Sequence, residues 1–250
     1  MAERVQKVLA NAGVGSRRQI EGWIKQGRII VDGKPAQLGD RLSGNEKIFV
    51  DGRPLRLPTA KRQRQFFLAY HKPAGEITSR DDPEGRATIF DNIRPPPHGR
   101  WITVGRLDIS TSGLLLLTTD GELAHRLMHP SYEISRAYAV RLYGALTSEQ
   151  RLELLSGVML DDGSARFDEI SDEGGTGANT WYRVTLREGR NREVRRIFEA
   201  IGIRVSRLMR VGYGPVSLGR LRRGETRRLS NEELEGLYAA VGLKTTGGSP

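Results

Sequence analysis

The sequence contains no cysteine among its 250 residues and only four histidines. The absence of cysteine excludes disulfide frameworks, thiolate metal sites and cysteine nucleophiles. Two histidines, His125 and His129, are four residues apart in a predicted helix, a spacing that can place two imidazoles on one metal ion. No third ligand is offered nearby, so we expect neither a metal site nor a cofactor.

Long apolar segments are also missing. The run Leu114–Leu117 has four consecutive leucines, whereas a membrane-spanning helix needs about 20 apolar residues. The first residues lead directly into an amphipathic helix, without the apolar core of a secretion signal. We therefore expect a cytoplasmic protein with no membrane partner.

Positive charge, by contrast, is abundant and unevenly distributed. The formal net charge is +10, the sequence pI is about 10.2, and 33 of the 40 basic residues are arginine. Residues 200–224 contain six arginines and no acidic residue. Arginine is the side chain best suited to bidentate phosphate contacts and to stacking on bases, so a nucleic acid is the expected partner.

Residues 1–60 have the pattern of a small domain. Apolar residues at helical spacing over 5–12 predict a first helix, and Ser16 with Gln19 forms a capping box for a second. Two short strands, 28–31 and 47–50, each precede an Asp-Gly turn. This stretch resembles the S-four-type RNA-binding domain, which implies RNA contacts by Arg17, Arg18 and Arg28. A helical hairpin docked on its neighbour is the alternative.

The rest of the chain predicts a larger domain. We expect a linker over 61–65, a catalytic domain over 66–243 and a disordered tail over 244–250. Many strands in meandering order, with a few helices, indicate an α+β fold with a mainly antiparallel mixed sheet. The glycine-rich segment 174–177 is expected to be a loop between strands, and residues 165–170 to be a strand.

The most informative stretch is 105–121, in which an Arg-Leu-Asp tripeptide precedes the four leucines. The leucines predict a buried strand, which places Asp108 in a turn beside the core. A carboxylate there either bonds its own backbone or is a reactive group displayed by a rigid scaffold. As a reactive group it would act as a nucleophile or base, provided that a cation keeps it ionised.

Three further segments carry candidate partners for this carboxylate or for RNA. A predicted strand over 134–143 carries Arg136 and Tyr138. The segment 188–196 enters a helix with Arg192, Arg195 and Arg196 off its apolar stripe, and a strand over 203–211 carries Arg207 and Arg210. Together, 105–121, 136–140 and 188–196 resemble the three signature motifs of the RsuA-type ribosomal RNA pseudouridine synthases. Among these they most resemble the RluB subgroup, which acts on large-subunit ribosomal RNA.

The resemblance implies an isomerisation of uridine to pseudouridine that needs no cofactor. Asp108 matches the essential aspartate, Tyr138 the tyrosine that stacks on the base, and Arg195 the cation that pairs with the aspartate. Arg106 would help to extrude the nucleotide, and Leu115 would line the pocket. Arg136 stands where many relatives have lysine. Further expected RNA contacts come from arginines of both domains: Arg17, Arg18, Arg28, Arg136, Arg190, Arg192, Arg207 and Arg210.

Two other functions fit parts of the pattern. A ribosomal RNA-binding protein with an inert Asp108 would have the same two domains, and it predicts RNA affinity without any new nucleoside. A serine hydrolase could use Ser112, His125 and Asp108, but no Gly-x-Ser-x-Gly motif surrounds Ser112. Nothing in the sequence suggests an obligate dimer, so we expect a monomer.

Overall fold

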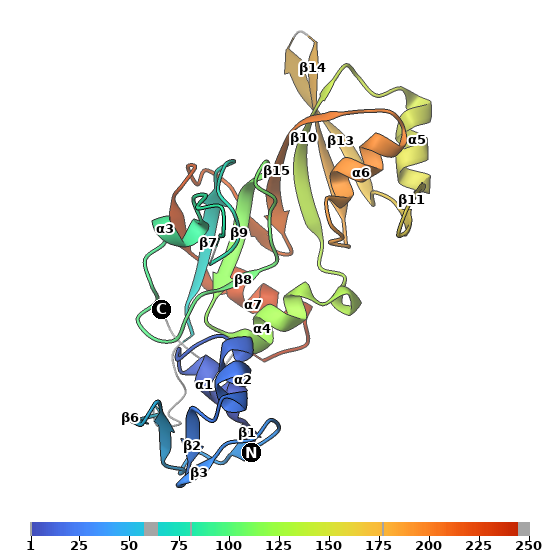
Figure 1. The fold of residues 1–250 in the computed structure, drawn as a ribbon. Helices are drawn as coiled ribbons and strands as arrows, with labels where there is room; N and C mark the ends of the chain where they lie inside the picture. Colours follow the sequence, from blue (N-terminus) through green and yellow to red (C-terminus); the bar gives the residue numbers. More distant parts are fainter. Residues whose placement is uncertain (1, 58–64, 81, 177, 245–250) are drawn as a thin grey trace.

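The structure is a computed structural model that describes residues 2–57, 65–80, 82–176 and 178–244 (Figure 1). Most of the expected linker and most of the expected tail lie outside these residues. The small amino-terminal domain occupies one end of the molecule, and its two helices lie next to α4 of the larger domain (Figure 1).

The amino-terminal domain combines two helices with a four-stranded sheet of order β3-β2-β5-β6. The predicted capping box is present: Ser16 and Gln19 exchange side-chain and backbone hydrogen bonds at the start of α2. Both residues of the Asp32-Gly33 turn have positive φ, 48° and 81°, as the expected hairpin turn requires. The elements are α1 (Val5–Asn11), α2 (Arg17–Lys25), β1 (Glu3–Arg4), β2 (Ile29–Val31), β3 (Lys34–Pro35), β4 (Arg41–Leu42), β5 (Ile48–Val50) and β6 (Arg53–Leu55).

The larger domain is built on one sheet of nine strands in the described part of the chain. Its main path runs β13-β14-β10-β15-β9-β7-β17, while β8 pairs with β9 and β16 with β15. Among the strand pairs of this sheet in the described residues, β15–β9 alone is parallel, so the predicted mixed, mainly antiparallel sheet is confirmed. The strands are β7 (Phe67–Lys72), β8 (Ile102–Val104), β9 (Ser112–Thr118), β10 (Arg136–Tyr143), β13 (Glu169–Thr176), β14 (Asn179–Leu186), β15 (Val205–Tyr213), β16 (Val216–Ser217) and β17 (Thr226–Arg228).

The four leucines of β9 are all buried because both faces of this central strand are covered. Leu114 and Leu116 pack in a core with α4 (Gly121–Met128) and α7 (Asn231–Ala240). Leu115 and Leu117 point to the other face, into a core that includes a residue of α3 (Ile89–Asn92). A third core, around β10 and β14, is covered by α5 (Ser148–Ser156) and α6 (Glu193–Ala200).

Two predictions for the second half of the chain were wrong, one of a strand over 165–170 and one of a loop over 174–177. Residues 165–170 are not one strand: β12 (Gly163–Ala165) pairs with β11 (Val158–Leu160), and β13 begins at Glu169. The glycines at 174 and 175 belong to β13, which has an irregular register against β14 between Asp172 and Gly175. A Cβ on Gly175 would lie 2.1 Å from the Asn179 carbonyl oxygen. The glycine therefore permits close approach of two strands.

Candidate active site

Asp108 lies in the connection between β8 and β9, half-buried at the edge of the core. The loop around it is fixed by Lys72, the last residue of β7, whose side chain is completely buried. The Lys72 Nζ donates hydrogen bonds to the backbone oxygens of Pro73 (3.0 Å), Asp108 (3.2 Å) and Thr111 (2.9 Å). One buried ammonium group thus holds both sides of the loop.

Further hydrogen bonds hold the same loop from the segment that follows β7. The Gly75 amide donates to the Ile109 carbonyl at 2.8 Å, and the Thr78 hydroxyl donates to the Leu107 carbonyl at 3.0 Å. Within the loop, the Thr111 amide donates to the Asp108 carbonyl at 3.0 Å. Asp108 is therefore displayed from a rigid backbone, as a catalytic carboxylate requires.

Lys72 is a site residue that the sequence analysis did not identify. Burial lowers its pKa to about 8, while the negative charges of Glu76 and Asp108 act in the opposite direction. At neutral pH the group is still a cation, and it stands beside the Asp108 backbone. The signal in the sequence is the position of Lys72 two residues after the apolar run Phe66–Tyr70, because a lysine buried with such a run is almost always paired with polar groups.

Arg195, on α6, is the second cation beside Asp108. Its Nη1 donates to the Val205 carbonyl at 3.0 Å, and its Nη2 lies 3.4 Å from both oxygens of Ser110. Burial and the charge of Arg192 lower the pKa of Arg195, whereas Asp108 raises it. Only 8% of Arg195 is exposed, so the side chain is buried although it lies off the apolar stripe of α6. The charge of Asp108 acts on it there.

Tyr138 lies two strands away from the Asp108 loop. It is half-buried on β10, directly opposite Arg210 of β15, and Arg210 in turn pairs with Gly113 at the start of β9. Two strand spacings amount to about 10 Å. A Cβ on Gly113 would lie 2.2 Å from the Arg210 carbonyl oxygen. Glycine at this position lets β9 approach β15, the strand that lies between β9 and the Tyr138-bearing β10.

Arg136 and Arg210 were predicted to contact RNA, and their burial argues against that role. They are only 7% and 2% exposed, and their guanidinium groups lie 5.2 and 5.1 Å from the ring centre of Tyr213. Arg136 donates to the carbonyls of Ile134 and Arg187, and Arg210 donates to that of Leu114 at 2.7 Å. Residues three apart in a strand point to opposite faces, which is why Arg207 is exposed and Arg210 is not.

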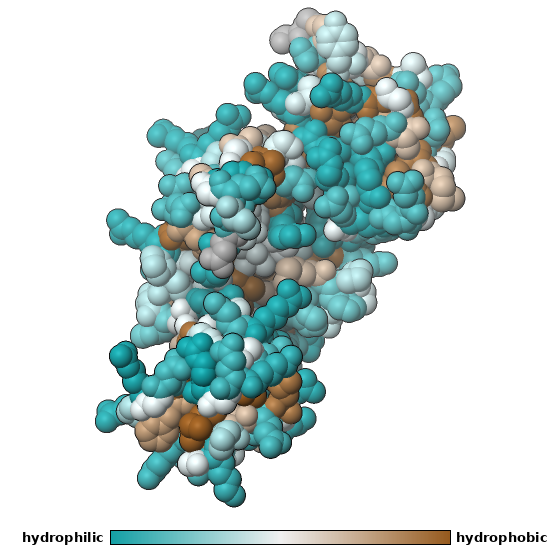
Figure 2. Space-filling model, in the orientation of Figure 1, coloured by the Kyte–Doolittle hydropathy of each residue, from teal (hydrophilic) through white to brown (hydrophobic). Residues whose placement is uncertain are grey.

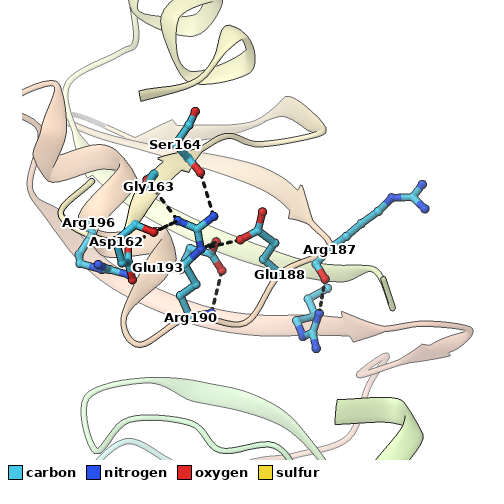
Figure 3. A network of polar contacts seen from close by, with 9 residues as sticks. Asp162, Gly163, Ser164, Arg187, Glu188, Arg190, Glu193 and Arg196 are labelled. Atoms are coloured by element: carbon cyan, nitrogen blue, oxygen red, sulfur yellow. Dashed lines mark hydrogen bonds and ion pairs between the residues drawn. The ribbon is translucent and has the colours of Figure 1, made fainter. Parts of the chain in front are cut away.

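Arg190 is held in a network of polar contacts (Figure 3). Its Nε donates to Glu188 at 2.6 Å, and its Nη2 donates to the Ser164 carbonyl at 2.8 Å. Asp162, in the turn between β11 and β12, accepts from both Arg190 (3.4 Å) and Arg196 (2.8 Å). The network ties this turn to the start of α6, so Arg190 orients the helix that carries Arg195.

The other predicted RNA contacts lie on the surface, where hydrophilic side chains cover most of the face shown in Figure 2. Arg28 is paired with Asp51 through two hydrogen bonds of 2.6 Å, and Arg192 lies 4.0 Å from Glu199. Four of the predicted RNA contacts are exposed, and in the described part of the chain none of these four forms an ion pair: Arg17, Arg18, Arg106 and Arg207.

The residues of the serine-hydrolase alternative do not assemble into a site. Across residues 2–57, 65–80, 82–176 and 178–244, no hydrogen bond joins Ser112, His125 and Asp108, and His125 is exposed on α4. No group of three histidine or acidic side chains that could hold a metal ion occurs among the described residues. Within those same ranges, the helices are too short or too polar to cross a membrane.

A displayed aspartate flanked by two buried cations, joined to a small basic domain, defines an RNA-modifying type of protein. The sequence profile of the RNA pseudouridylate synthase family matches residues 66–200, and that of the S4 domain matches residues 3–48. The chain belongs to the RNA pseudouridylate synthase family. The resemblance inferred from the three motifs is thereby confirmed, as is the two-part fold.

Individual relatives give the same result. The chain is 53% identical over 246 residues to the ribosomal large subunit pseudouridine synthase B of Pseudomonas aeruginosa, covering 98% of this chain and 64% of that protein. It is 54% identical over 220 residues to the synthases B of Yersinia pestis and Escherichia coli K12, covering 87% of this chain and 69% and 76% of those. A solved pseudouridylate synthase aligns with a TM-score of 0.64 and 28% identity over 94% of this chain and 99% of its own.

Proposed function

We propose that the protein converts uridine to pseudouridine in large-subunit ribosomal RNA. The observation that carries the proposal is the fixed Asp108 loop with Lys72 and Arg195 beside it. In this reaction the bond between ribose C1′ and uracil N1 breaks and a bond between C1′ and uracil C5 forms. N1 gains a proton and C5 loses one, so no redox partner or external leaving group is required.

Asp108 is the group proposed to start the reaction. As a carboxylate it either attacks C1′ or removes a proton from the ribose, and both routes need it ionised. Lys72 and Arg195 place two positive charges beside this carboxylate. They also limit the reorganisation required when charge moves from the carboxylate to the departing uracil.

Tyr138 is proposed to stack on the uracil and to assist removal of the C5 proton. Its half-buried ring is on β10, and β15 lies between this strand and β9, which follows the Asp108 loop. The target must leave the RNA stack to reach this position, because the site lies at the edge of a folded domain. Arg106, exposed in the same loop as Asp108, is the proposed contact for the displaced strand.

The small domain is proposed to position the RNA. Arg17 and Arg18 lie in the first turn of α2, exposed and free to meet phosphates, which favour a helix amino terminus. Arg28 and Arg207 extend the basic surface across both domains. The earlier expectations of a monomeric, cytoplasmic protein without a membrane partner stay as part of this proposal.

The test maps pseudouridine in large-subunit ribosomal RNA, as transcripts and as assembling subunits, after incubation with the protein and without added cofactor. The matched variant is Asp108→Asn, which keeps the side-chain size. We expect new pseudouridine with the unaltered protein and none with Asn, at equal RNA affinity. If both proteins bind RNA and neither forms pseudouridine, the alternative of a non-catalytic RNA-binding protein replaces the proposal.

A further inference from the structure

Ile109, the residue directly after Asp108, is unusual in its exposure. Its side chain is 41% exposed, which makes it one of six large hydrophobic residues classed as exposed in the described part of the chain. Consecutive Cα atoms are about 3.8 Å apart, so this apolar side chain stands at the mouth of the candidate active site. Single exposed apolar residues are common, but this one lies beside the proposed catalytic carboxylate.

The backbone under Ile109 is held firmly. Its own carbonyl accepts the hydrogen bond from Gly75, and the carbonyls on either side, of Asp108 and Ser110, accept from Lys72 and Arg195. Isoleucine is branched at Cβ, so its χ1 angle has few options. The side chain is therefore presented in a defined direction with little entropy left to lose on binding.

The exposed residues around Ile109 are either small or polar. The turn that bonds to its carbonyl contains Ala74 and Gly75, both exposed and both small. Arg106 and Ser110, its exposed neighbours in the loop, are polar. An apolar side chain of this kind is the type that proteins insert between base steps when they distort a nucleic acid.

We propose that Ile109 is a wedge that occupies the space vacated in the RNA stack when the target uridine enters the site. This rests on the proposed function and assigns a positioning role to a residue adjacent to Asp108. The apolar side chain contacts the exposed faces of the neighbouring bases and offsets part of the cost of unstacking. Because the loop fixes Ile109 relative to Asp108, insertion of the wedge aligns the ribose with the carboxylate.

The experiment compares Ile109→Ala, Ile109→Ser and Ile109→Leu on two substrates. One is a stem-loop transcript containing the mapped target uridine in a base pair. The other has the same sequence with an abasic site opposite the target, so that the uridine is already unpaired. The control is Met159→Ala, since Met159 is 76% exposed on β11, in the two-stranded β11–β12 sheet that is separate from the main sheet.

On the paired substrate, we expect Ala and Ser to lower the rate of pseudouridine formation about 10- to 100-fold, with Leu within about threefold of the unaltered protein. On the abasic substrate, all three variants should be within about threefold of it. Met159→Ala should leave both rates unchanged. Equal losses on both substrates would overturn the wedge and show a general structural role, and full activity of Ala and Ser on the paired substrate would also overturn it.

A second measurement separates this proposal from the proposed function. 2-Aminopurine placed next to the target uridine becomes brighter when stacking is lost, and it reports extrusion without chemistry. Asp108→Asn should brighten the probe fully, whereas Asp108→Asn combined with Ile109→Ala should not. If the unaltered protein brightens the probe, Ile109→Ala does not, and neither forms pseudouridine, the wedge stands and the enzyme proposal fails. If both Asp108→Asn proteins brighten the probe equally, the wedge proposal is refuted and the enzyme proposal is unaffected.

Discussion

Replacing Lys72 with methionine tests whether a buried cation positions the catalytic loop. Methionine keeps the length and packing of the side chain but removes all three hydrogen bonds to the loop carbonyls. The Asp108 carbonyl keeps its bond from the Thr111 amide, so the loss falls on the carbonyls of Pro73 and Thr111. An unsatisfied buried carbonyl costs about 1–3 kcal/mol.

The folding cost is partly offset because the variant no longer buries an ammonium group. We therefore expect the free energy of unfolding to change by no more than about 2 kcal/mol. Activity should suffer far more, since a displacement of about 1 Å at a reacting group can lower the rate about 100-fold. RNA affinity should stay unchanged, because Lys72 is 0% exposed.

The assay measures single-turnover pseudouridine formation, RNA affinity and urea unfolding for Lys72→Met. The control is Arg227→Met, which breaks the 2.6 Å ion pair between Arg227 and Glu233 on β17 and α7. The control should lose stability without losing the rate of the chemical step. A folded Lys72→Met protein whose rate is within threefold of the unaltered protein would refute the positioning role.

The pH dependence gives an independent check on the same residue. Above the Lys72 pKa of about 8, the neutral amine has two N–H donors for three carbonyls, so activity should fall. Stability should move the opposite way between pH 8 and about 10.4, since the unfolded chain then binds more protons than the folded one. The fall in activity therefore cannot come from unfolding, and it should be absent from the residual activity of Lys72→Met.

Three further predictions follow from the same structure. Burial raises the pKa of Glu193 to about 7. Between about pH 4.3 and 7 the folded state then binds more protons than the unfolded state, so the free energy of unfolding should fall as pH rises. Urea titrations of Glu193→Gln should lack this decrease between about pH 4.3 and 7. Gly113→Ala should cost about 3 kcal/mol or more through its contact with the Arg210 carbonyl. Gly39 is the matched control, because its φ of 103° is close to the 109° of Gly113 while open space surrounds it. Gly39→Ala should lower the free energy of unfolding by only about 1 kcal/mol in the same assay. Arg207→Met should weaken RNA binding and reduce its salt dependence by about one phosphate contact, whereas Arg190→Met should lower the thermal unfolding temperature. If Arg207→Met lowered the unfolding temperature and Arg190→Met weakened RNA binding instead, the positions given to these two arginines would be wrong.

Features that depend on neighbours in the chain were predictable from the sequence. The capping box of α2, the Asp-Gly turns and the helix begun by Asp120 require only a few adjacent residues, and the structure contains all of them. The boundaries 1–60, 61–65, 66–243 and 244–250 stay predictions, and residues 58–64 and 245–250 lie outside the description. The three motifs also identified the family, since their order along the chain is itself a sequence property.

The tertiary structure decided which charges serve the site and which face the solvent. Arginines at 136, 195 and 210 look identical in the sequence to those at 106 and 207, yet the first three are buried. Strand pairing separates Arg210 from Arg207, because the register of β15 against β10 and β9 determines which face each side chain occupies. Arg195 is buried because α6 packs on the core around β10 and β14. Lys72 became a site residue through the pairing of β7 with β9. The sequence alone determined most of the elements and the family, and it singled out Asp108, while long-range packing determined the cations around that carboxylate.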